Sequence, residues 1–176
     1  MIRVLTLLTA AAAGPAVAQS YYDVEIIVFE QLNANAVPNT PTAAAAPVLP
    51  AEPPVAATPD TRFEPLPPNK LQLRPEYQSL RTSKSYRPLL HLGWRQQVLG
   101  PRNSVARPML EQTGSGLING DLKIYMETFL HIDLDLTFEV PGEGSYRLRD
   151  SRRVRSRETH YFDNPRFGIL IRLTPS

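Results

Sequence analysis

The sequence predicts a single α+β domain, in which an antiparallel sheet of about four to six strands packs against one or two helices. Three observations favour this class. Apolar and polar residues alternate strictly from Leu122 to Phe138, apolar residues fall at helical spacing between Leu71 and Ser83, and further extended runs are separated by turn residues. The 176 residues include no cysteine, so a single domain stabilised by its apolar core is expected.

The first residues have the pattern of a secretory signal peptide. Arg3 precedes an apolar run from Val4 to Ala13, and small residues follow at positions 16–18. A membrane span needs about 20 apolar residues, and this run is well short of that. We therefore expect cleavage after Ala18, and a mature domain of residues 19–176 that lies in the periplasm without a membrane span.

The first part of the mature chain combines a strand with a segment of low complexity. Tyr22 to Phe29 is rich in β-branched and aromatic residues, which predicts an early, central strand. Residues 33–68 are rich in Pro and Ala, and such a segment buries too little apolar surface to offset its ordering entropy. We expect a disordered excursion from the domain, with a proline-rich ligand for a partner groove as the alternative.

A short amphipathic helix follows, because Leu73, Tyr77 and Leu80 fall on one helical face. Pro75 would lie in the first turn of this helix, where its missing N–H is harmless. An extended run from Tyr86 to Val98 then predicts a strand that carries Trp94, and the basic residues 101–108 are expected to form an irregular loop.

The clearest periodic signal lies between positions 121 and 138. Eight apolar residues occupy even positions, namely Leu122, Ile124, Met126, Leu130, Ile132, Leu134, Leu136 and Phe138. The odd positions carry Asp121, Lys123, Glu127, His131, Asp133 and Asp135. This alternation predicts a sheet with one dry and one wet face, and because the run is too long for one straight strand, it must bend, bulge or split.

Two more extended runs complete the expected sheet. A turn at residues 141–144 leads to an extended run at 146–161, and a second turn at 163–166 leads to a closing strand. One face of that closing strand carries Phe167, Ile169, Ile171 and Leu173.

Catalytic motifs with a phosphate loop, nucleophile elbow, zinc helix or cysteine nucleophile are absent from the sequence. The best candidate constellation is His131, Asp133 and Asp135, which share the wet face of one strand as a metal or acid–base site would require. Alternating polar residues on a solvated face produce the same spacing routinely. A metal-dependent hydrolase that uses these three residues is therefore an alternative function.

Six arginines lie between positions 147 and 157. On a regular strand, one face carries Arg147, Arg149, Arg153, Arg155 and Arg157. Guanidinium groups bind carboxylates bidentately, so this row is the candidate ligand-binding site, and its ligand would be a polymer that bears carboxylates. The alternative is that the row pairs across the sheet with Asp133, Asp135 and Glu127.

Charge and composition disfavour nucleic acid as a partner. The formal net charge is +2, and removing Arg3 with the signal peptide leaves +1. No aromatic stacking row interleaves the arginines, and an exported protein does not meet nucleic acid in its working compartment.

Four stretches of the chain resemble the CsiV family of periplasmic peptidoglycan-binding proteins. They are Tyr21–Phe29, Tyr86–Gln96, Phe129–Leu136 and Arg152–Leu170. The resemblance implies a periplasmic protein that binds peptidoglycan. It also implies that the protein supports a class A penicillin-binding protein through that synthase's outer-membrane lipoprotein activator. Because catalytic motifs are absent from the sequence, we expect that it is not an enzyme and has no cofactor. A structural envelope assembly factor, which contacts a partner at a sheet edge, stays open as a further alternative.

The signal peptide leads to a direct prediction. The mature protein should begin at Gln19 and be recovered in the soluble periplasmic fraction, because the small residues before that position fit the signal peptidase. Intact-mass analysis of the exported protein measures this, and a mass that retains Arg3 would contradict it.

Overall fold

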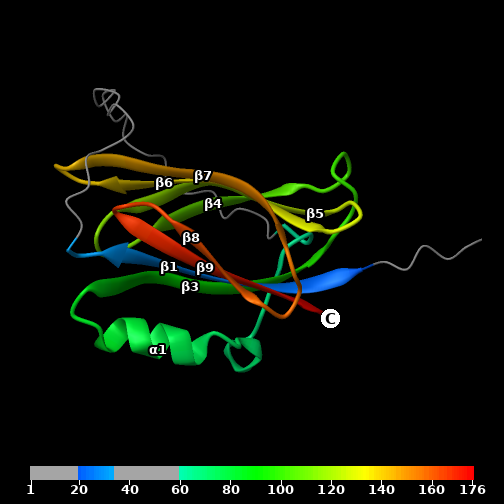
Figure 1. The fold of residues 1–176 in the computed structure, drawn as a ribbon, viewed down its shortest axis with the longest axis horizontal. Helices are drawn as coiled ribbons and strands as arrows, with labels where there is room; N and C mark the ends of the chain where they lie inside the picture. The colour runs from blue at the N-terminus through cyan, green and yellow to red at the C-terminus, as the bar shows by residue number, and fades with distance from the viewer. Residues whose placement is uncertain (1–19, 34–59) are drawn as a thin grey trace, which may run out of the picture.

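The computed structural model describes residues 20–33 and 60–176, which form strands with one α-helix and one short 3₁₀ helix (Figure 1). The strands are β1 (Tyr21–Gln31), β2 (Glu64–Pro65), β3 (Tyr86–Gln97), β4 (Ala106–Gln112), β5 (Leu117–Met126), β6 (Leu130–Val140), β7 (Gly144–Val154), β8 (Thr159–Asp163) and β9 (Phe167–Pro175). The helices are η1 (Pro68–Lys70) and α1 (Arg74–Thr82).

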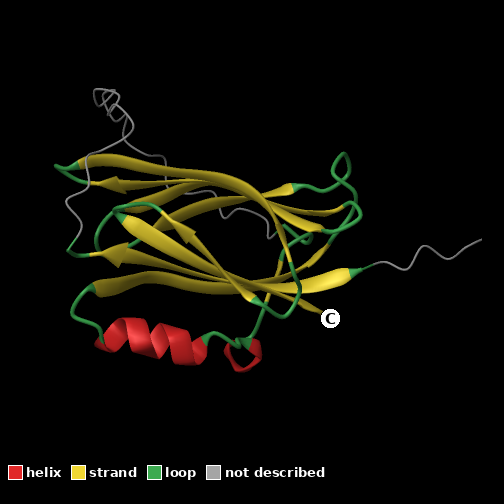
Figure 2. Cartoon of the chain, in the orientation of Figure 1, coloured by secondary structure: helices red, strands yellow, loops and turns green. Residues whose placement is uncertain are grey.

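The strands form two antiparallel sheets that face each other, with α1 on the outside of one sheet (Figure 2). The first sheet has five strands in the order β2-β3-β1-β9-β8, and the second has four in the order β4-β5-β6-β7. β1 is central, as the sequence predicts, because it pairs with both β3 and β9.

The main core lies between the two sheets. It receives alternate residues from the long strands β1, β5, β6 and β9, as the period-two pattern predicts. The alternating run splits at a turn, residues 127–129, into β5 and β6, and the even-numbered side chains of both strands enter this core. The first sheet contributes Val24, Ile26 and Val28 of β1, together with the predicted face of β9.

A second, smaller core lies on the other face of β1. Ile27 and Phe29 of β1 pack there against Leu73 and Leu80, with Tyr77 of α1 partly buried beside them. The helix has the predicted apolar face and the predicted proline at its N-terminal end. β1 is therefore covered on both sides, which explains why all of its residues from Val24 to Glu30 are buried.

The expectation of an α+β domain with one sheet of four to six strands is wrong. In the described residues there are nine strands in two sheets and one helix of nine residues, so the domain is mostly β. The physical reason is that a long dry sheet face needs an apolar layer of equal size above it. One short helix cannot supply that layer, and the second sheet does.

Two strands replace expected irregular structure. β4 begins at Ala106, inside the basic stretch that was expected to be a loop, and pairs along its length with β5. Within the expected excursion at residues 33–68, the chain from Asp60 onward is structured, since Phe63 is buried and β2 pairs with β3. Residues 34–59 and the expected signal peptide lie outside the described residues.

Among the described residues, no helix is long and apolar enough to cross a membrane.

Glu25 on β1 leads to a stability prediction. Its carboxylate is buried and accepts hydrogen bonds from the backbone N–H of Gln72 at 2.6 Å and of Leu73 at 2.9 Å, and it lies 2.6 Å from Nε2 of His91. Replacing Glu25 by Ala should lower the free energy of unfolding by about 2 to 4 kcal/mol, because several buried groups lose their partner at once. Urea denaturation measures the change.

The matched control for this variant is Glu64→Ala, which removes an exposed carboxylate from the same sheet. It should change the free energy of unfolding by less than about 0.5 kcal/mol. Equal effects of the two substitutions would show that the buried hydrogen bonds of Glu25 do not stabilise the fold, and would contradict this prediction.

Candidate functional site

The outer face of the four-stranded sheet carries most of the charged residues that the sequence singles out. Because side chains alternate across a strand, the odd-numbered residues of β5, β6 and β7 all project from this face. The register aligns them in the cross-strand rows Tyr125–His131–Arg153, Lys123–Asp133–Ser151 and Asp121–Asp135–Arg149.

The predicted arginine row is divided between a strand and a turn. Arg147, Arg149 and Arg153 lie on β7 and are exposed. The strand ends at Val154, so the expectation of continuous extended structure through 161 is wrong, and Arg155 and Arg157 lie in the β7–β8 turn. Arg157 has a φ of 65° in the left-handed region, and its N–H donates to the carbonyl of Leu173 at 2.7 Å.

Asp135 is the main anionic partner of the strand arginines. Nε and Nη2 of Arg147 donate to its two carboxylate oxygens at 2.7 and 2.6 Å, and Nε of Arg149 is 3.9 Å away. The hydrogen bonds from Arg147 hold the pKa of Asp135 below its ordinary value, and the same pair raises the pKa of Arg147. Cross-strand pairing, the alternative to ligand binding, therefore holds for Asp135.

The other two carboxylates of that alternative do not pair with arginine in the described residues. Asp133 accepts a hydrogen bond from Oγ of Ser151 at 2.6 Å and a longer one, 3.4 Å, from the hydroxyl of Tyr125. Burial, followed by the charge of Asp133, raises the pKa of Tyr125. Glu127 lies in the β5–β6 turn, where its described contact is a backbone hydrogen bond to Phe129.

His131, Asp133 and Asp135 share one face, as predicted, but each side chain has a different environment. The ring of His131 stacks on Tyr125 with centroids 5.1 Å apart, whereas the two carboxylates face Ser151 and Arg147. Across the described parts of the chain, no group of three or more His, Cys, Asp or Glu residues could hold a metal ion. The arrangement gives no support to a metal-dependent hydrolase at these residues.

The remaining arginines have incomplete charge compensation. Arg153 lies over the ring of Phe129, with its guanidinium carbon 4.4 Å from the centroid, and that ring is half exposed. Nη1 of Arg155 is 3.7 Å from the Glu158 carboxylate, and the side chain of Arg155 is 78% exposed. These guanidinium groups are accessible to an anionic ligand.

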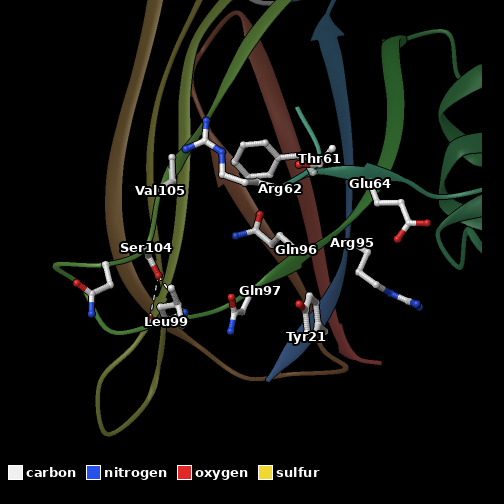
Figure 3. Close-up of a pocket in the computed structure, with 12 residues that line it drawn as sticks. Tyr21, Thr61, Arg62, Glu64, Arg95, Gln96, Gln97, Leu99, Ser104 and Val105 are labelled. Atoms are coloured by element: carbon white, nitrogen blue, oxygen red, sulfur yellow. Dashed lines mark hydrogen bonds between the residues drawn. The ribbon is translucent and has the colours of Figure 1, made fainter. Parts of the chain in front are cut away.

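A pocket that the sequence analysis missed lies at one end of the sandwich (Figure 3). Its volume is about 250 Å³, and it is formed by the beginning of β1, the end of β3, residues 61–64 and the loop of residues 99–105. Gln96 lies in its wall and is 3% exposed, with its Oε1 accepting a hydrogen bond from Nε1 of Trp94 at 2.7 Å. The signal for this site was a polar residue at a core position of β3, between Trp94 and Val98.

The structure is a β-sandwich with an arginine-rich strand at the edge of one sheet and a pocket at one end. The chain belongs to the CsiV family, since the family model described as "Peptidoglycan-binding protein, CsiV" matches residues 1–176. This confirms the resemblance seen in the sequence, and peptidoglycan is the partner of the family. No curated protein and no solved structure matches the chain.

The pair of Arg147 and Asp135 leads to a titration prediction. Replacing Arg147 by Gln should raise the pKa of Asp135 towards its ordinary value, because the charged hydrogen bonds that favour the carboxylate are lost. In the unchanged protein, the stabilisation from this carboxylate is present above its unfolded pKa and is lost as the pH falls through its lowered folded pKa. Titration by carboxyl-selective NMR measures the shift.

The control for this titration is Arg149→Gln, which removes a guanidinium that is 3.9 Å from the same carboxylate. It should raise the pKa of Asp135 by less than Arg147→Gln does. An equal or larger shift in the control would contradict the assignment of Arg147 as the dominant partner.

Proposed function

We propose that this protein is a periplasmic, non-catalytic adaptor that binds peptidoglycan through the arginines of β7 and the β7–β8 turn and supports a cell-wall synthase. The ligand-binding residues of this proposal are Arg147, Arg149, Arg153, Arg155 and Arg157. Peptidoglycan as the ligand follows from the family, and the binding residues, the adaptor role and the periplasmic location are the proposal.

The observation that carries the proposal is the excess of positive charge on this segment. Residues 145–158 contain six arginines and two acidic residues, Asp150 and Glu158. Asp150 pairs with Arg152, and Glu158 is at a longer distance from Arg155. Guanidinium groups that repel each other on one segment are stabilised when a ligand brings further carboxylates.

The location of the segment suits a polymer. β7 is an edge strand of the four-stranded sheet, so nothing in the described sheet lies beyond it on that side. Side chains at alternate positions of a strand are about 7 Å apart, which spaces the guanidinium groups along a line. A peptidoglycan strand that follows this line would meet them with the carboxylates of its stem peptides.

The synthase is proposed as a class A penicillin-binding protein, reached through its outer-membrane lipoprotein activator. This part derives from what the family resemblance implies. Binding to the wall would hold the adaptor where new glycan is inserted. The edges of β4 and β7 are the backbone surfaces that a partner strand could extend, which keeps an assembly role compatible with the same fold.

Substitution of the turn-proximal arginines tests the proposal. Replacing Arg153, Arg155 and Arg157 together by Gln should weaken binding to purified sacculi by up to about 100-fold, because each exposed ion pair contributes about 0 to 1 kcal/mol and three are lost. Binding of the unchanged protein should also weaken as salt rises, since the Debye length falls from about 8 Å at physiological ionic strength to about 3 Å at 1 M. Co-sedimentation with sacculi measures both effects.

A second triple variant is the matched control. Replacing Lys70, Arg81 and Lys84 by Gln removes the same number of exposed positive charges from the region of η1 and α1. This control should bind sacculi like the unchanged protein. If the arginine variant stays folded and binds fully at every salt concentration, the arginine segment is not the binding surface. If it instead loses thermal stability while its folded fraction still binds, the arginines are structural.

A further inference from the structure

The pocket at the end of the sandwich has a hydrogen-bond donor in its wall that no other side chain in residues 20–33 and 60–176 uses. Trp94 Nε1 can only donate, so the oxygen of the Gln96 amide must face it, and the Nε2 group must face the other way. Figure 3 shows the Gln96 side chain directed into the pocket. Among the described residues, Nε2 has no hydrogen-bond partner, and the exposed fraction of Gln96 as a whole is 3%.

The orientation of Gln96 is fixed by its surroundings. The indole of Trp94 is 1% exposed, and the guanidinium of Arg107 lies over its ring at 4.4 Å. Gln96 therefore packs beside a ring that is held in place from the opposite sheet. Because its oxygen is used by Trp94, the Nε2 group is held facing the pocket, where a ligand carbonyl could accept its hydrogen bond.

The charged residues around the pocket are already compensated. Arg62 donates to both carboxylate oxygens of Asp60, and Arg95 is paired with Asp23 at 2.7 Å. Glu64 is the register partner of Arg95 on β2, and both side chains project away from the pocket interior (Figure 3). The pocket is therefore suited to a neutral ligand, unlike the arginine segment.

The other walls combine apolar and hydroxyl-bearing side chains. Leu99, Val105 and Phe63 supply apolar surface, and the ring of Tyr21 is 41% exposed at the pocket. Small-molecule sites typically have about 300 to 1,000 Å³, so a pocket of about 250 Å³ accommodates one sugar-sized ring and not an oligosaccharide.

We infer that this pocket binds one N-acetylated sugar unit of a glycan strand, with Gln96 Nε2 donating to the acetamido carbonyl and the apolar wall contacting the acetyl methyl. The inference rests on the proposed function for the identity of the polymer, and it assigns the glycan, as distinct from the stem peptides, to a second site. An acetamido group fits the observations because it is neutral, accepts one hydrogen bond and ends in a methyl group.

The start of β1 and the end of β3, which line the pocket, lie at the same end of the sandwich as the β7–β8 turn, the right-hand end in Figure 1. The loop of residues 99–105 joins the two regions, because the N–H of Met126 on β5 donates to the carbonyl of Leu99 at 2.8 Å and Nζ of Lys123 donates to that of Pro101 at 2.7 Å. β5 continues into the β5–β6 turn, where Phe129 lies under Arg153. One ligand strand could therefore contact both sites.

The test uses the neutral β-1,4-linked trisaccharide of N-acetylglucosamine, which has no stem peptide and no charge. NMR titration of the full mature protein should show shifts at the side-chain amide of Gln96. Cellotriose, which has a hydroxyl in place of each acetamido group, should bind at least 10-fold more weakly. Equal binding of the two sugars, or no binding of the acetylated one, would overturn the inference.

Two variants locate the site. Gln96→Glu keeps an oxygen for Trp94 and removes the amide donor, and it should weaken trisaccharide binding at least 10-fold. Because a buried carboxylate can destabilise the fold, Val105→Trp is the second variant, since it fills the pocket from an exposed position. Unchanged trisaccharide binding by a folded Val105→Trp protein would overturn the inference.

The arginine variant separates this inference from the proposed function. The protein with Arg153, Arg155 and Arg157 replaced by Gln should bind the trisaccharide like the unchanged protein, at low and at high salt. If sacculus binding depends on the arginines but the trisaccharide never binds, the pocket assignment alone fails. If the trisaccharide binds at the pocket but sacculus binding ignores the arginines, the arginine mechanism alone fails.

Discussion

The structure depends on a central strand that is buried on both faces. β1 lies between the main core and the smaller core beneath α1, so each of its side chains from Val24 to Glu30 must be either apolar or fully partnered. Glu25 and Glu30 are the two exceptions to apolarity, with exposed fractions of 4% and 2%. A buried carboxylate is tolerated only when hydrogen bonds or opposite charge replace the water it loses. Glu25 has two backbone N–H donors and the ring of His91, and Glu30 has two arginines.

The partners of these two carboxylates connect the layers of the domain. The carboxylate of Glu25 accepts a hydrogen bond from the backbone of the segment that enters α1. The carboxylate of Glu30 forms ion pairs with Arg166 at 2.9 Å and with Arg87 at 3.3 Å. Arg166 also reaches Glu143 in the β6–β7 turn at 2.8 Å, which ties the first sheet to the second. In the same turn as Arg166, Asn164 donates to the backbone carbonyl of Arg147 at 3.0 Å. The beginning of the arginine-rich strand is thus positioned by contacts that start at β1.

Sequence reasoning predicted those features of the structure that are determined by residues close together in the chain. Alternation identified the buried face of β5 and β6, and helical spacing identified α1, because both patterns are set by local backbone geometry. The number of sheets depends on which strands meet in space, and no local pattern reports that.

The left-handed turn at Arg157 was missed because glycine or asparagine usually marks such a position. The pocket combines three segments distant in sequence, and only the polar Gln96 in the core phase of β3 indicated it.

Recognition of a polymer places particular demands on such a surface. Exposed guanidinium–carboxylate pairs are individually weak, and a small pocket for one sugar is also a weak site. A repeating ligand binds more tightly than these single contacts do, because once one unit is bound the next is present at high effective concentration. The proposed arginine contacts lie on an edge strand and on the turn that follows it, and the pocket lies at the same end of the sandwich as that turn, so a ligand strand would gain contacts in sequence without a deep cleft. The contacts on the strand cost little conformational entropy when a ligand unit binds, because the strand is already ordered. A surface of this kind would bind the wall reversibly, which is compatible with the proposed adaptor role.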